Sequence, residues 1–325
     1  MSQVSFVRWL FSLSLLCMSA SANADIQSLP ISCGEGNETL YGTLLLPTHK
    51  VKPPVVLIIS DAGAIDRDGN IASMKGKNDS LKMLAEELAI AGYATVRFDK
   101  RGVAESKRAG REEEMMRFQM LVADAESWLK QLSNDARFGA VGLIGHGEGA
   151  SVAILAAKAG GPRALVTIAG VAQSASKILR AQLKGKFSGE LAQANEDILS
   201  RLERGQLVDE VPAPLLPLYR PSVQKYLISW FSVVPKNAVA QLSIPVAVVQ
   251  GDRDLLVNLA EAEALAAAAA KPKLIIVHGM NHILKDVEMD TQKQLESYTD
   301  PFLPLNQDLI KQVVSFLRTH LVSVP

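Results

Sequence analysis

The chain has 325 residues, of which 48% are hydrophobic, and equal numbers of basic and acidic side chains, 34 of each. This composition is ordinary for a globular protein, and the length is sufficient for a large hydrophobic core. A formal net charge of zero gives no argument for nucleic acid or an anionic membrane surface as a partner. The sequence has no internal repeat, and only the alanine run at 266–270 is of low complexity.

The first 24 residues have the features of a secretory signal peptide. Arg8 precedes an apolar run at 9–18, and Ala22-Asn23-Ala24 is a small-x-small cleavage site. The run is shorter than the ~20 apolar residues that span a bilayer, which argues against stable membrane insertion. We therefore expect an exported protein, periplasmic or secreted, whose mature chain begins near Asp25 and keeps Cys33 as its single cysteine.

Short apolar runs alternate with helical patterns along residues 25–325. Residues 26–46 predict an entry hairpin, and later strands are expected at 55–59, 94–98, 141–144, 164–168, 245–250 and 274–277. Helical spacing of apolar residues occurs between these runs, and a last amphipathic helix is predicted over 307–321. Continuous apolar strands separated by helices predict an α/β fold with a mostly parallel, doubly wound sheet.

A segment at about 171–240 interrupts this alternation. Its first half is polar and helical, and its second half combines five prolines with Tyr226, Trp230 and Phe231. Proline excludes a central strand, and the aromatic side chains need an apolar surface to cover. We expect an inserted helical cap that forms one wall of a substrate pocket. The alternative is a packing appendage without a role in binding.

The segment at 140–149 reads AVGLIGHGEG and predicts a buried strand, a very tight turn and a helix. Gly145 and Gly149 have the spacing of the nucleophile elbow, G-x-S-x-G, whose central residue is the nucleophile. That central residue is Gly147, so the serine is absent. G-x-G-x-G alone is a weak signal, since glycine-rich turns also bind phosphate, but no complete nucleotide-binding motif follows it.

Two later strands end in residues that can act with such a turn. Asp252 and Asp254 follow the strand at 245–250, and His282 follows the strand at 274–277. The order of elbow, acid and base is that of an α/β-hydrolase triad. The spacing alone does not decide between the two aspartates.

Several strings of residues resemble exported bacterial α/β-hydrolases related to dienelactone hydrolases and serine aminopeptidase-like esterases. They are GHGEG at 145–149, DRDGN at 66–70, FDKRGV at 98–103, YRPSVQ at 219–224, YLISWF at 226–231, GDRD at 251–254 and MNH at 280–282. The resemblance implies an α/β-hydrolase fold with a helical cap, no cofactor, and a small-molecule ester or acyl ligand. It also implies that His282 is the base, Asp254 orients it, and the N–H groups of Ala62 and Glu148 form the oxyanion hole.

The chain departs from that pattern at two neighbouring places. Gly147 stands at the nucleophile position, and Asp61 stands where the family has glycine, beside the expected oxyanion donors. A carboxylate there opposes negative charge on a substrate unless it is turned away or protonated. Ser151 and Cys33 are poor substitutes for the nucleophile, because Ser151 lies a helical turn below the elbow and Cys33 lies in the entry hairpin. His278 and His282 straddle a strand end and a glycine-containing loop, which is not the spacing of a helical zinc pair, and no metal is expected.

Two functions follow from these features. The first is a member of a carboxylic ester hydrolase family that is impaired at Gly147, since loss of a nucleophile removes on the order of a millionfold in turnover. Weak hydrolysis by water that His282 activates is part of this first hypothesis. The second is a non-catalytic pseudo-hydrolase that binds a small acyl or aromatic ligand under the cap. Under the first hypothesis, Gly147→Ser restores activity, if necessary together with Asp61→Gly.

Overall fold

The computed structural model describes residues 26–110 and 112–322, so the expected signal peptide lies outside the described residues. Eight strands form one sheet in the order β1-β2-β4-β3-β5-β6-β7-β8. Strands β1 and β2 form the antiparallel entry hairpin, β2 also pairs with β4 in antiparallel fashion, and all the other pairs are parallel. Their bounds are β1 Ile26–Cys33, β2 Leu40–Pro47, β3 Val55–Ile59, β4 Ala94–Phe98, β5 Val141–His146, β6 Ala164–Ile168, β7 Val246–Gly251 and β8 Pro272–Val277.

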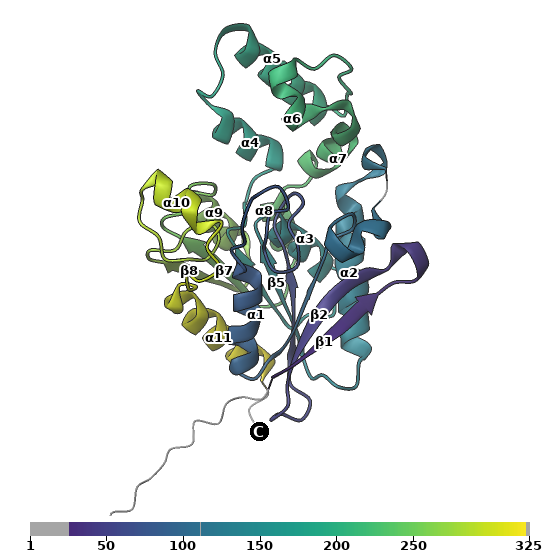
Figure 1. The fold of residues 1–325 in the computed structure, drawn as a ribbon, viewed down its shortest axis with the longest axis vertical. Coiled ribbons are helices and arrows are strands. Elements are labelled where there is room, and N and C mark those ends of the chain that lie inside the picture. The colour runs from purple at the N-terminus through teal and green to yellow at the C-terminus, as the bar shows by residue number, and fades with distance from the viewer. Residues whose placement is uncertain (1–25, 111, 323–325) are drawn as a thin grey trace, which may run out of the picture.

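Helices cover both faces of the sheet, because the side chains of the central strands alternate between two apolar clusters. One cluster includes residues of α2, α3, α8 and α9, and the other includes residues of α1 and α11 (Figure 1). The predicted α/β fold is confirmed. The helices of these layers are α1 Ser80–Ile90, α2 Phe118–Asn134, α3 Glu148–Ala157, α8 Pro235–Val239, α9 Leu259–Ala268 and α11 Gln307–Leu321. A short helix, α10 Thr291–Ser297, lies in the connection between β8 and α11.

The cap is a group of helices that lies beyond the carboxyl ends of the parallel strands (Figure 1). Its helices are α4 Ala175–Leu183, α5 Gly189–Glu203, α6 Leu216–Tyr219 and α7 Pro221–Phe231. They share an apolar cluster of their own, in which Leu199, Leu215 and Tyr219 are fully buried. Pro221 begins α7, a position at which proline costs no hydrogen bond. Helix α8 packs on α3 and α9 beside the sheet, so the cap ends before it.

A few elements differ from the sequence-based expectation. Strand β5 continues to His146, two residues beyond the apolar run, and short 3₁₀ helices occupy Gly36–Glu38, Ala104–Ala109, Glu113–Met115 and Ala213–Leu215. Helix α10 was not expected, because its apolar content is low. Within the described part of the chain, none of the helices has both the length and the apolar character that crossing a bilayer requires.

Candidate functional site

Gly147 alone separates β5 from α3, and its backbone (φ 55°, ψ −118°) is one that side-chain-bearing residues rarely adopt. The flanking glycines are required by close approach. A Cβ atom on Gly145 would lie 2.2 Å from the carbonyl oxygen of Gly149, and one on Gly149 would lie 2.5 Å from that of Ile59. Strand, turn and helix therefore have the tight geometry of a nucleophile elbow.

The Asp61 side chain fills the space that a side chain at position 147 would take. A Cβ atom on Gly147 would lie 1.9 Å from Asp61 Oδ1 and 2.1 Å from Asp61 Cγ. The Glu148 N–H donates to Asp61 Oδ1 at 2.6 Å, and Asp61 Oδ2 lies 2.9 Å from His282 Nε2. One carboxylate thus contacts both the expected oxyanion donor of the elbow and the ring nitrogen that would face a serine hydroxyl.

The opposite side of the histidine ring contacts Asp254, whose Oδ2 lies 2.8 Å from His282 Nδ1. Asp254 is held in turn by the N–H groups of Leu256 and Val257, which donate to its Oδ1 at 2.7 and 2.9 Å. Asp252 does not reach this histidine. It pairs instead with the exposed His278, at 2.8 Å between Oδ2 and Nδ1. The geometry therefore places Asp254, and not Asp252, beside His282.

The two carboxylates determine the charge of the histidine. Burial by itself lowers the pKa of His282, but Asp254 and Asp61 outweigh burial and raise this pKa to about 10. Burial likewise raises the pKa of Asp61, but the hydrogen bond and charge of His282 outweigh it, so the pKa of Asp61 falls below its ordinary value. At neutral pH the centre is an imidazolium between two carboxylates.

This charge state bears on two expectations. An imidazolium has no lone pair with which to take a proton, so the contact with Asp61 opposes the action of His282 as a base at neutral pH, and that role stays a prediction. A serine at position 147 would also require the Asp61 side chain to move, because its Cβ would lie 1.9 Å from Asp61 Oδ1. The carboxylate of Asp61 is neither turned away from the site nor protonated.

Residues around the centre hold these groups in place. His146 Nε2 lies 2.8 Å from the carbonyl oxygen of His282, and burial lowers the pKa of His146, so this neutral ring supports the backbone of its neighbour. The Tyr226 hydroxyl of the cap donates to Glu148 Oε1, and Lys100 Nζ lies 3.6 Å from Glu148 Oε2. Lys100 Nζ also donates to the carbonyl oxygen of Asp61. The cap, the elbow and the loop of Asp61 are therefore joined through one buried glutamate.

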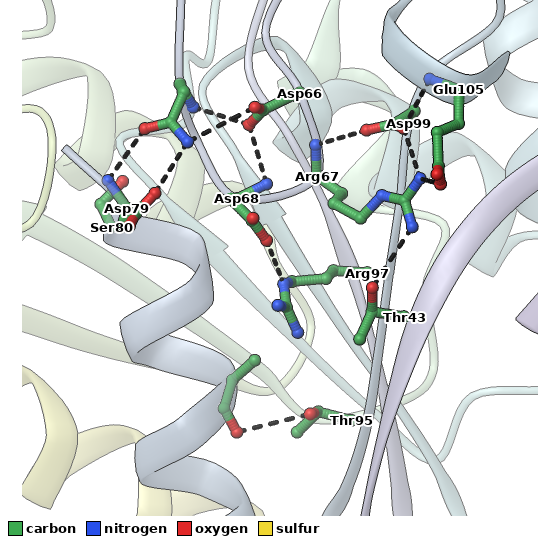
Figure 2. Close-up of polar contacts among 12 residues, drawn as sticks. Thr43, Asp66, Arg67, Asp68, Asp79, Ser80, Thr95, Arg97, Asp99 and Glu105 are labelled. Carbon is green, nitrogen blue, oxygen red and sulfur yellow. Dashed lines mark hydrogen bonds and ion pairs between the residues drawn. The ribbon is translucent and has the colours of Figure 1, made fainter. Parts of the chain in front are cut away.

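Polar contacts fix the loop that follows Asp61, as Figure 2 shows. The Arg67 backbone N–H and Nη2 donate to the two oxygens of Asp99 at 2.8 and 2.6 Å, and Arg67 also pairs with Glu105. Arg97 Nε donates to Asp68 Oδ1 at 2.7 Å. Because Asp99 and Arg97 belong to β4 or follow it directly, the loop is tied to the sheet and holds Asp61 in position.

A cavity of about 260 Å³ opens between the elbow and the cap. It is lined mainly by apolar residues and includes Ala62, Ser151, Trp230 and Phe231 with the groups of the centre. Cys33 lies elsewhere, buried at the end of β1. In the described ranges no group of three or more side chains is arranged to hold a metal ion.

Sequence reasoning missed several of these contacts. Lys100 and Tyr226 occur in strings that carry the family resemblance, yet nothing in those strings connects them to Glu148. Asp61 stands out in the sequence as a departure, but its bond to His282 spans 221 positions and leaves no local signal. His146 occupies a variable position of the elbow motif, so the motif assigns it no role.

The sheet order, the elbow and the adjoining histidine–aspartate pair define an α/β-hydrolase. Residues 74–288 match the model of the serine aminopeptidase, S33, family (Hydrolase_4), and the chain belongs to that family. A search of curated proteins by sequence finds no match.

Solved structures with the same fold include several ester hydrolases. Est1E from Butyrivibrio proteoclasticus is 17% identical, with a TM-score of 0.60, and the alignment covers 90% of this chain and 99% of that one. Dienelactone hydrolase from Anabaena variabilis is 16% identical, with a TM-score of 0.54, and 91% and 99% of the two chains are covered. The esterase domain of a Rhodothermus marinus protein is 16% identical, with a TM-score of 0.55, at the same coverage of 91% and 99%.

Proposed function

We propose that this α/β-hydrolase has lost the acyl-enzyme chemistry of its family and binds a small molecule in the pocket under its cap. The observation that carries the proposal is the position of the Asp61 carboxylate, which contacts both Glu148 N–H and His282 Nε2. Acyl transfer by this family's mechanism needs a nucleophilic hydroxyl, a neutral histidine beside it and a vacant oxyanion site. Gly147 removes the first, the charge of Asp61 stabilises the protonated form of the second, and Asp61 Oδ1 occupies the Glu148 N–H of the third.

Asp61 occupies the centre much as a product would. Hydrolysis of an ester yields a carboxylate, and a carboxylate bound at such a centre would contact the oxyanion donors and the protonated histidine. Asp61 supplies that group from within the chain, without the entropy cost of binding a separate molecule. An ester carbonyl must displace it before reaching the Glu148 N–H.

Hydrolysis by activated water has no support in this arrangement. His282 is already protonated at neutral pH, and the lowered pKa of Asp61 makes its carboxylate a weak base. The other feature of the site is its cavity, which has a mostly apolar lining and a few polar groups. Such a lining suits a small aliphatic or aromatic body. A structure of Est1E with ferulic acid bound is among those with the same fold, and that aromatic ligand is of the size class proposed.

The test is to compare covalent reactivity with ligand binding in the natural protein. A fluorophosphonate probe should leave the protein unlabelled, and its turnover of activated short-chain esters should not change on His282→Ala. The exposed His278→Ala is the matched control for background hydrolysis by a surface imidazole. Small aromatic compounds should raise the melting temperature. Turnover that His282→Ala abolishes and His278→Ala preserves would show that the centre is still catalytic.

A further inference from the structure

The charged side chains that line the pocket under the cap are two carboxylates and one histidine, and the histidine is already paired with carboxylates. The charged lining residues are Asp61, Glu148 and His282, and neither lysine nor arginine is found among the described residues that line it. The side chain of Asp61 is 18% exposed, compared with 7% for His282 and 1% for Asp254. Asp61 is therefore the most accessible of these three side chains, with a carboxylate that a molecule in the pocket can reach.

The two cationic side chains near the pocket, His282 and Lys100, are already paired with protein oxygen atoms. The His282 ring lies between Asp254 and Asp61, with one carboxylate on each ring nitrogen. Lys100 contacts Glu148 and the Asp61 carbonyl oxygen, and it lines a separate cavity on the far side of Glu148. Asp61 Oδ1 accepts a hydrogen bond from the Glu148 N–H and Asp61 Oδ2 accepts one from His282 Nε2, and a carboxylate oxygen can accept two. Asp61 thus retains acceptor capacity on the side that faces the cavity.

We infer that the ligand of this pocket is a small monoamine with an apolar, preferably aromatic, body, and that its ammonium group pairs with Asp61. This inference rests on the proposed binding function and specifies its ligand class. A carboxylate ligand is disfavoured, because it would face Asp61 at close range and would have to displace it from Glu148 and His282. The aromatic lining residues Trp230 and Phe231 are compatible with a cation, since aromatic faces attract one.

The experiment compares three probes that share one phenethyl skeleton: phenethylamine, phenethyl alcohol and hydrocinnamate. Binding to the full mature chain is measured by titration calorimetry, or by ligand-observed NMR if affinity is low. Phenethylamine should bind at least about tenfold more tightly than the alcohol, with hydrocinnamate weakest. Added salt should weaken the binding of the amine and leave that of the alcohol nearly unchanged.

The variant Asp61→Asn keeps the shape of the side chain and removes its charge. It should abolish the preference for the amine over the alcohol, and a cooperative thermal unfolding transition shows that the variant is folded. The matched control is Asp252→Asn, because Asp252 also pairs with a histidine but does not line the cavity. That control should retain the preference for the amine.

Three other outcomes of these binding experiments would contradict the inference or the proposed function. If hydrocinnamate binds the natural protein as tightly as phenethylamine, the ligand class inferred here is wrong and a binding function stands. If Asp61→Asn retains the preference for the amine, Asp61 is not the recognition group. If none of the three probes binds, the proposed binding function fails together with this inference.

Discussion

Asp61 is the residue from which the properties of the centre follow. Its carboxylate lies where a nucleophile's side chain would be, and it keeps His282 protonated. In the Asp61→Asn variant one of the two charges beside the ring is gone, so the pKa of His282 should fall from about 10 towards the ordinary value of 6.5. NMR of the imidazole nitrogens over a pH titration measures this change directly. An unchanged pKa of His282 would mean that Asp61 does not contact the ring in solution.

The contact between Asp61 and His282 makes the free energy of unfolding depend on pH, and the sign of this dependence follows from the shifts of their two pKa values. The folded pKa of His282 is raised, so its stabilising contribution is complete below 6.5 and is lost as the pH rises to about 10. The pKa of Asp61 is lowered, so its contribution is present above 3.8 and is lost as the pH falls below that value. The free energy of unfolding of the natural protein should therefore exceed that of Asp61→Asn most between about 4 and 6.5. Urea unfolding of both proteins across the pH range measures the difference, which should shrink at alkaline pH.

At the scale of residues, the sequence predicts which residues belong to the site but not how their side chains contact one another or how those contacts shift their pKa values. The elbow glycines, Asp254 and His282 each follow a strand, and their order is informative by itself. The state of His282 depends on a contact between two loops distant in the sequence, and a side-chain conformation of Asp61 has no signature in a linear pattern. The contact that opposes the predicted role of His282 as a base could not be foreseen for that reason.

At the scale of elements, one hydrogen bond joins the cap to the elbow. The Tyr226 hydroxyl on α7 donates to Glu148 at the start of α3, and Glu148 is 5% exposed. Tyr226→Phe leaves a buried carboxylate oxygen without this donor and should cost about 1–3 kcal/mol of unfolding free energy. It should also increase proteolysis within the cap. The exposed Tyr41→Phe is the control and should change neither quantity. Equal stability of the two variants would show that this bond does not fasten the cap.

The loop that carries Asp61 depends on a buried ion pair. Arg67 contacts both Asp99 and Glu105, whose side chains are 1% and 69% exposed. Asp99→Ala removes the buried partner and should cost about 3–5 kcal/mol. Glu105→Ala removes the exposed partner and should cost about 0–1 kcal/mol. Denaturation gives both values, and amide hydrogen exchange at 61–70 should accelerate only in Asp99→Ala. Similar costs for the two variants would contradict the account of how this loop is held.

At the scale of the whole molecule, the sequence was sufficient to predict the sheet, since its central strands are short, mostly apolar runs that are buried on both faces. The last helix, Gln307–Leu321, has the bounds expected from its apolar spacing. The cap was placed by its prolines and aromatic residues, but its end before α8 was not predictable. Helix α8 lies beside the sheet because Ala238 and Val239 pack into the main core. No local sequence pattern distinguishes this packing from packing within the cap.

The scaffold as a whole belongs to a hydrolase family, and we propose that Asp61 takes the place and the contacts of that family's nucleophile. Labelling by a fluorophosphonate probe tests it most directly, in Gly147→Ser, Asp61→Gly and the variant that combines them. Gly147→Ser alone should stay unlabelled, because its Cβ would meet Asp61 at 1.9 Å, and Asp61→Gly alone has no hydroxyl at the elbow. The combined variant should be labelled at the new serine and should hydrolyse activated esters several powers of ten faster, and a further His282→Ala should remove both gains. Labelling of Gly147→Ser as fast as the combined variant, or no labelling of a folded combined variant, would contradict the account.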